Sequence, residues 1–297
     1  MSDLYAWLAT LAERGSLPEA FRFAFFVRGM LSILVLAPLL GGLSHLVVAR
    51  RLSFFSAALG QAALTGLTIG LLLGEPIHGA YGGIFGFCAL SALAMVWVKR
   101  RARLPSDTLV GVFLSLTLGL GICLLVAVTK RFNVHQIEAV MFGSLLTVTD
   151  GDLLLLAGLA VLVALLLGWV YNHVLLDSLD PSIAAASGVR TTLLEYVFVL
   201  VLTAAIVVSL KVIGALLIEA MVVVPAAASR NLARGLRSHL LGSMLAALAA
   251  GVAGLFVSSR FLVQSGGAVV LAMSVIFFAT LGVGALRGGV SEDMRPR

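Results

Sequence analysis

The chain has 297 residues, of which 61% are hydrophobic and 11% charged, and its mean hydropathy is +1.12. Soluble domains carry about 25% charged residues, so this composition excludes a soluble globular protein. The formal net charge of +6 does not indicate a nucleic-acid partner. The Lys and Arg residues lie in short segments between apolar runs, where such residues set membrane topology.

Apolar runs recur along the whole chain, as a hydrocarbon core about 30 Å thick requires of membrane-spanning helices. We predict eight clear spans and one short, doubtful span, and hence an all-α polytopic bundle of eight to nine transmembrane helices. The segments lie near residues 23–49, 53–74, 79–98, 108–128, 153–174, 193–210, 212–229, 239–259 and 261–286. Lys211 divides the two short segments within 193–229, and Pro225 lies in the second. This pattern predicts a broken helix pair.

The ends of the chain are predicted to lie outside the bundle. Residues 1–22 contain acids and lack a basic segment followed by a small-residue cleavage site. We therefore predict an N-terminal extension with a short interfacial helix rather than a signal peptide. Residues 23–287 form the predicted transmembrane domain and residues 288–297 a cytoplasmic tail. Most of the 20 Lys and Arg residues can share one side of the bundle, which predicts a cytoplasmic C-terminus.

Two connections are longer than a tight turn. Residues 130–152 fall on the outer side, and a surface or re-entrant half-helix fits their half-apolar composition. Residues 175–192 fall on the cytoplasmic side. There Asp180, Pro181 and Ser182 form a helix start, and Gly188 ends the helix after a run of alanines. A brief helix of such small residues buries little by itself, which indicates docking to a partner.

No catalytic pattern is present in the sequence. The chain lacks GxSxG, HExxH, a Cys-rich cluster and a GxxxxGK[ST] phosphate loop. Cys88 and Cys123 both fall in apolar segments and are expected to be small packing residues. The informative residues are therefore polar groups within the predicted spans, since these are costly in hydrocarbon and usually face a bundle interior or water.

Glu219 is the most isolated polar group in the predicted spans, six residues before Pro225. It is either a proton or cation site or a neutral, hydrogen-bonded carboxyl that ties helices together.

A second polar group is a stripe on the segment 53–74. Steps of 100° per residue place Ala57, Gln61, Thr65 and Thr68 on one narrow face. This face either lines a pathway or supplies hydrogen bonds between helices. At the predicted outer mouth, Glu75 and His78 flank Pro76 and either attract a cation or form a solvated turn.

Five stretches occur in an order and at a spacing that resemble a known family. They are RRLSFFSAALGQAALTGLTIG (50–70), DTLVGVFLSLTLGLG (107–121), FGSLLTVTDGDL (142–153), DPSIAAASGV (180–189) and VIGALLIEAMVVVPAAASR (212–230). The chain is similar to the membrane permeases of zinc, manganese and iron ABC importers, relatives of the type II importers for vitamin B12 and siderophores. The resemblance covers about residues 25–286.

The resemblance implies a multi-pass permease of the bacterial inner membrane that forms a homodimer with the pathway on its two-fold axis. Two cytoplasmic ATPase subunits, which use ATP and Mg²⁺, and an external substrate-binding protein would complete the importer. This chain would bind no cofactor and catalyse no reaction. The residues implied to contact the ATPase are Asp180, Pro181, Ser182, Ala184, Ala185 and Gly188, and Glu75 and His78 would face the binding protein.

Three positions depart from the family pattern. Family members carry an Asp and a His associated with metal passage where this chain has Ala57 and Gln61. Glu219 stands where the family more often has a small or hydroxyl residue. One hypothesis is an oxygen-rich metal site of Glu219 with Gln61, Thr65 or Thr68, which suits manganese or iron(II) better than zinc. The rival is a lining that binds no metal. The alternative to an ABC permease is a stand-alone secondary transporter that uses Glu219 as its coupling carboxylate.

Overall fold

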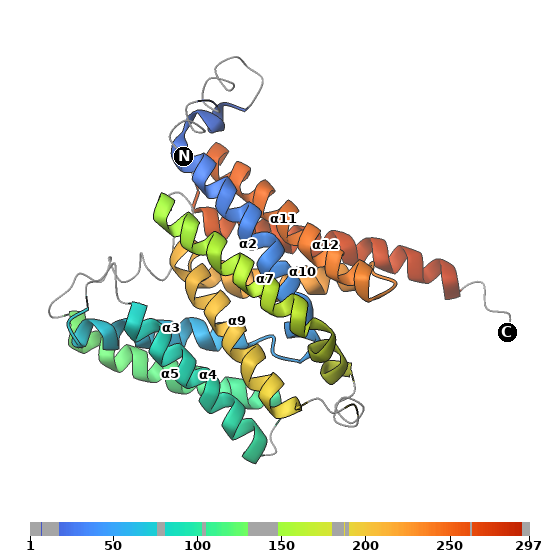
Figure 1. Ribbon diagram of the computed structural model, residues 1–297. Helices are drawn as coiled ribbons and strands as arrows, with labels where there is room; N and C mark the ends of the chain where they lie inside the picture. The colour runs from blue at the N-terminus through green and yellow to red at the C-terminus, as the bar shows by residue number, and fades with distance from the viewer. Residues whose placement is uncertain are drawn as a thin grey trace. The chain divides into compact units, whose positions relative to one another are not determined.

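The computed structural model describes residues 7, 18–75, 81–102, 105–129, 148–179, 187, 190–261 and 263–292, and helices are the sole regular structure in these ranges (Figure 1). The helices in chain order are η1 (Glu19–Arg22), α2 (Ala24–Ala49), α3 (Phe55–Leu72), α4 (Tyr81–Ala102), α5 (Ser106–Thr129), α7 (Asp150–Leu179), α9 (Thr191–Ile213), α10 (Ala215–Arg230), α11 (Leu236–Phe261) and α12 (Ser265–Glu292).

Within the described ranges, eight helices are long and apolar enough to cross a membrane: α2, α3, α4, α5, α7, α9, α11 and α12. The prediction of an all-α polytopic membrane protein is confirmed. The doubtful ninth segment is α10, which has 16 residues. At a rise of 1.5 Å per residue it is about 24 Å long, shorter than the roughly 30 Å hydrocarbon core.

The prediction that Lys211 separates the two short helices is wrong. Lys211 lies inside α9, and the break falls at Gly214, whose φ is 80° and ψ is 162°. Glycine adopts a positive φ at little cost because it lacks a Cβ atom, whereas a single lysine leaves the helical backbone unchanged. The Gly214 N–H still donates to the Leu210 carbonyl at 2.8 Å, so the helical hydrogen bonds of α9 continue up to Gly214 and its backbone angles make the break.

Two predicted boundaries also shift. Lys99, Arg100 and Arg101, expected in a loop, form the last turn of α4, where cations interact favourably with the helix dipole. Helix α7 begins at Asp150 rather than 153, because Thr149 and Asp152 form a capping box. The Thr149 hydroxyl accepts from the Asp152 N–H, and the Asp152 carboxylate accepts from the Thr149 N–H, each at 3.2 Å. Residues 130–147, predicted to hold a half-helix, lie outside the described residues.

The structure divides into two compact units, of which the first comprises residues 1–48, 144–154 and 220–297. Its helix α11 packs on α12 and on α2. The buried Ser243 hydroxyl of α11 donates to the Gly41 carbonyl of α2 at 2.8 Å. The Ser44 hydroxyl of α2 accepts from the N–H of Ala226, the residue after Pro225, at 3.0 Å. His45 is 2% exposed and contacts the His239 ring edge-to-face, with centroids 4.6 Å apart. Polar groups thus join α2 to α10 and α11.

The second unit comprises residues 49–143 and 155–219. Helix α3 lies at its centre, buried along most of its length, and packs against α4, α5 and α9 (Figure 1). The contact of α3 with α4 is closest at Gly66 and Gly83. A Cβ atom added at Gly66 would lie 2.6 Å from the Gly83 carbonyl oxygen. Glycine at both positions lets the two backbones approach this closely.

Candidate translocation and coupling site

The polar stripe of α3 changes character along the helix. Ala57 and Gln61 are half-exposed, whereas Thr65 and Thr68 are buried with no exposed surface. The Thr65 hydroxyl contacts the Thr117 carbonyl of α5 at 2.8 Å and the Gln61 carbonyl at 3.2 Å. The Thr68 hydroxyl donates to the Thr65 carbonyl at 2.7 Å. Hydrogen bonding between helices is therefore observed at Thr65, and the accessible part of the stripe is Ala57 and Gln61.

Glu219 lies against the same helix. It is half-exposed on α10, and a Cβ atom added at Gly60 would lie 3.4 Å from its Oε1 atom. Because Gly60 directly precedes Gln61, the carboxylate lies beside the accessible part of the stripe. Among the described residues no three His, Cys, Asp or Glu side chains are grouped as metal ligands. Any metal contact here would combine one carboxylate with amide, hydroxyl or carbonyl oxygens. The role of Glu219 as a ligand stays a prediction.

At the predicted outer mouth, the Glu75 carboxylate accepts a hydrogen bond from the Gly83 N–H at 3.2 Å. Gly83 belongs to the first turn of α4, where a carboxylate is stabilised by free N–H groups and by the helix dipole. Glu75 therefore caps α4, and its contact with a binding protein stays a prediction. His78 lies outside the described residues.

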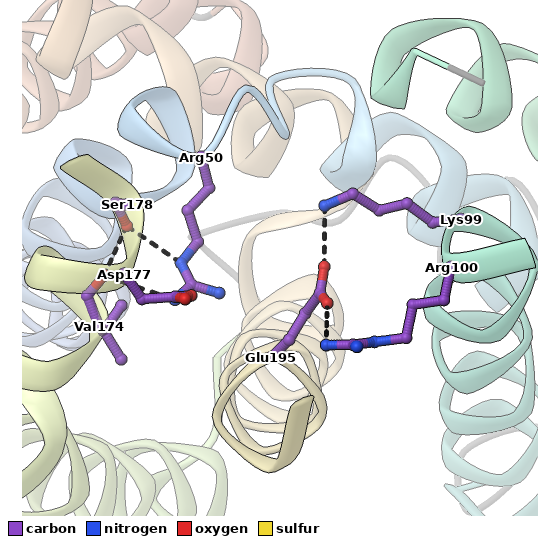
Figure 2. A network of polar contacts seen from close by, with 7 residues as sticks. All are labelled: Arg50, Lys99, Arg100, Val174, Asp177, Ser178 and Glu195. Carbon is purple, nitrogen blue, oxygen red and sulfur yellow. Dashed lines mark hydrogen bonds and ion pairs between the residues drawn. The ribbon is translucent and has the colours of Figure 1, made fainter. Parts of the chain in front are cut away.

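The predicted ATPase-contacting residues Asp180, Pro181, Ser182, Ala184, Ala185 and Gly188 also lie outside the described residues. The structure describes both flanks of this segment, the C-terminal turn of α7 up to Leu179 and the start of α9 from Thr191. A network of charged side chains, which sequence reasoning missed, joins these flanks to two other parts of the chain (Figure 2).

The α7 flank is held by Arg50, the residue after α2. Its guanidinium donates to the Asp177 carboxylate at 2.7 Å, to the Ser178 hydroxyl at 3.1 Å and to the Val174 carbonyl at 3.4 Å. The side chains of Arg50 and Asp177 are 7% and 12% exposed. Burial lowers the pKa of Arg50, and the carboxylates of Asp177 and Glu195 oppose that shift. An arginine keeps its charge under these conditions, so this is a buried ion pair.

The α9 flank is held by the end of α4. Lys99 Nζ lies 2.8 Å from one carboxylate oxygen of Glu195, and Arg100 lies 2.8 Å from the other. Arg100 also donates to the Thr192 hydroxyl at 2.8 Å. Figure 2 shows Glu195 reaching from α9 toward both cations.

Both sets of contacts surround a cavity of about 530 Å³. Its lining residues are Ala49, Arg50, Arg51, Leu52, Lys99, Arg100, Asp177, Ser178, Thr191 and Glu195. The sequence feature that could have indicated this network is the position of Asp177 and Glu195, two acids within otherwise apolar stretches. Their partners could not be found from sequence because they are 127 and 96 residues away.

Comparison with known proteins decides the family. The model of the ABC 3 transport family matches residues 22–284. The chain belongs to this family. The resemblance to permeases of metal ABC importers is confirmed, and the protein is a multi-pass permease of the bacterial inner membrane with the type II importer fold. In this family the permease is not the enzyme, and ATP is hydrolysed by a separate subunit.

Individual relatives cover nearly the whole chain. The manganese import system permease protein ScaB of Streptococcus gordonii is 29% identical over 87% of this chain and 91% of its own length. The manganese transport system membrane protein MntC of Listeria innocua is 29% identical over 86% of this chain and 90% of its own. A solved structure, PsaBC from Streptococcus pneumoniae in complex with Fab, superposes with a TM-score of 0.75 and 27% identity. It covers 87% of this chain and 91% of that chain.

Proposed function

We propose that this permease forms the translocation pathway for a divalent transition metal, with manganese as the first candidate and zinc or iron as alternatives. The observation that carries the proposal is near-full-length similarity to permeases named for manganese import. The metal would be delivered by an external binding protein. Transport would be driven by two cytoplasmic ATPase subunits that use ATP and Mg²⁺, while this chain itself binds no cofactor.

The side chains near α3 are consistent with this cargo. Glu219 Oε1 lies beside Gly60, and the amide of Gln61 is half-exposed one residue further on. Carboxylate and amide oxygens suit manganese, whereas imidazole and thiolate favour zinc. Passage needs ligands that bind weakly enough to release the ion, and a site of one carboxylate with neutral oxygens meets that need.

The proposed assembly is a homodimer with the pathway on its two-fold axis. The segment that contains Asp180 and Gly188 would contact the ATPase, and the turn at Glu75 and His78 would face the binding protein. The competing function is a secondary transporter that uses Glu219 for coupling. Family membership favours the ATP-driven machine, and uptake by the purified chain alone, without ATPase or ATP, would overturn our proposal.

The test is uptake of radiolabelled manganese and zinc by cells that carry the complete importer. Glu219→Gln removes the charge and keeps the shape, and we expect manganese uptake to fall while surface expression stays unchanged. Glu219→Asp keeps the carboxylate and is expected to retain part of the uptake. Asp152→Asn is the matched control, because it removes a carboxylate that caps α7 and has no part in the proposed pathway, and uptake of both metals should stay unchanged.

A complementary variant changes the neutral lining. Gln61→His introduces an imidazole, and we expect the ratio of zinc to manganese uptake to rise. If Glu219→Gln and Gln61→His both leave the two uptake rates unchanged, the lining does not select the metal. The hypothesis of a metal site at Glu219 would then be wrong.

A further inference from the structure

The ion pairs that surround the 530 Å³ cavity have a common topological feature. Each joins one flank of the segment 180–189 to a part of the chain distant in sequence. Arg50 comes from the connection between α2 and α3, and Lys99 and Arg100 come from the last turn of α4. A displacement of either flank would therefore act, through charged contacts, on the connection before α3 or on α4.

Arg50 contacts both flanks at once. Its guanidinium donates to Asp177 and Ser178 of α7, and its Cζ atom lies 4.8 Å from the centroid of the Phe198 ring on α9. A planar guanidinium suits this dual role because its edge donates hydrogen bonds while its face stacks on an aromatic ring. With 7% of the side chain exposed, water competes little for these donors.

The connection from Arg50 to α3 is short. Arg51 has a φ of 55°, a left-handed conformation uncommon for residues other than glycine. The Phe55 N–H then donates to the Leu52 carbonyl at 2.9 Å, and Leu52 is buried at 7% exposure. This tight turn, anchored by the buried Leu52 side chain, ties the position of Arg50 to the start of α3. Helix α3, which begins at Phe55, carries Ala57 and Gln61.

We infer that Arg50 is a positioning residue that couples the segment 180–189 to α3, with the contacts of Glu195 to Lys99 and Arg100 as a second link to α4. The inference rests on the proposed function, because it assumes that the ATPase acts on this segment. It adds the route by which that action reaches the accessible stripe: from the ends of α7 and α9 through Arg50 to the first turn of α3.

The experiment uses the complete importer in proteoliposomes and measures metal uptake and ATP hydrolysis on the same sample. Arg50→Gln is expected to keep ATPase co-purification and ATP hydrolysis while metal transported per ATP falls. The expected fall is between about 5-fold and 150-fold, the usual range for coupling between two sites. Arg50→Lys keeps the charge but loses the planar fork of the guanidinium. The metal transported per ATP in Arg50→Lys should therefore lie between the values for Arg50→Gln and for the unchanged chain.

Arg101→Gln is the matched control. Arg101 follows Arg100 in the last turn of α4, is exposed and stacks on Trp97 at 4.7 Å from the ring centroid, and it does not line the cavity. Its loss also removes one cytoplasmic-side charge, and the ratio of transport to hydrolysis should not change. The double variant Arg50→Asp with Asp177→Arg exchanges the two charges and so tests the ion pair itself. Compared with Arg50→Asp alone, it should regain part of the metal transported per ATP.

Two outcomes would overturn the inference. In the first, Arg50→Gln leaves the metal transported per ATP unchanged at full hydrolysis. In the second, Arg50→Gln lowers metal uptake and ATP hydrolysis in equal proportion. If Arg50→Gln is not recovered folded, Arg50→Lys and the charge exchange carry the same test. Failure of the unchanged chain to transport metal with its ATPase present would refute the proposed function instead, so the two failures are distinguishable.

Discussion

The closest contact between α3 and α4 predicts a large effect for a single methyl group. In Gly66→Ala the new Cβ atom would lie 2.6 Å from the Gly83 carbonyl oxygen and 2.8 Å from the Ile84 Cα atom. Both are backbone atoms, which cannot rotate away as a side chain would. The two helices must therefore separate by several tenths of an ångström along this contact.

The magnitude follows from two opposing terms. Overpacking costs about 1–3 kcal/mol, and two clashes with backbone place Gly66→Ala in the upper half of that range. Alanine is favoured over glycine inside a helix by about 1 kcal/mol. The net destabilisation of the α3–α4 contact is about 1–2 kcal/mol, which raises its opening equilibrium about 5-fold to 30-fold.

A native thiol reports this opening. Cys88 of α4 is fully buried, and its Sγ atom lies 3.7 Å from the Leu59 carbonyl of α3. The only other cysteine is the exposed Cys123, so Cys123→Ser leaves Cys88 as the sole thiol. In detergent, labelling of Cys88 by a thiol-reactive dye should be about 5-fold to 30-fold faster in Gly66→Ala, following its opening equilibrium.

Gly111→Ala on α5 is the control, because a Cβ atom there meets no atom within 4 Å. Its labelling rate should stay the same or fall. Equal rates in Gly66→Ala and Gly111→Ala would refute the view that glycine at position 66 is required for the α3–α4 contact.

Two further predictions use hydrogen bonds and ion pairs described above. Thr65→Val removes the donor to the Thr117 carbonyl and should cost about 0.6 kcal/mol, the average for hydrogen bonds between membrane helices. Thr68→Val, which loses a bond within its own helix, should leave the α3–α5 contact intact. Loss of metal uptake in Thr65→Val at unchanged thermal stability would assign Thr65 to the pathway instead. Arg28→Gln breaks the 2.7 Å pair with Asp150, whose side chains are 32% and 42% exposed, and should cost about 0.2–1 kcal/mol. Repeating the unfolding at about 1 M salt should shrink that difference, and a difference independent of salt would contradict the assignment.

The apolar runs predicted the helices well because each span needs about 20 apolar residues whatever its neighbours are. The eight clear spans follow from this requirement, and the segment at α10 was doubtful because, at 16 residues, it falls short of it. Boundaries depended on local chemistry that hydropathy does not capture. The capping box at Thr149 extended α7, and the conformation of Gly214 rather than the charge of Lys211 placed the break between α9 and α10.

The candidate site was predictable only in part. Helical periodicity placed Ala57, Gln61, Thr65 and Thr68 on one face, but it could not show that Thr65 is hydrogen-bonded to α5. The ion pairs of Arg50 and Glu195 were out of reach, since they join residues about 100 or more positions apart. Their cations had been interpreted as topology signals alone. A basic residue at a helix end can both set membrane topology and form an ion pair. The packing of the second unit shows with which acid it pairs.

The break at Gly214 has a consequence for how sequence variation in this protein is interpreted. Its backbone angles lie where any residue with a Cβ atom is strained by about 1–3 kcal/mol. A systematic mutational scan would therefore rank position 214 among the least tolerant in the chain, beside any residue that handles the cargo. Intolerance to substitution at Gly214 would reflect the backbone conformation at the break between α9 and α10. A mutational scan therefore locates a transport site only when the stability of each variant is measured as well.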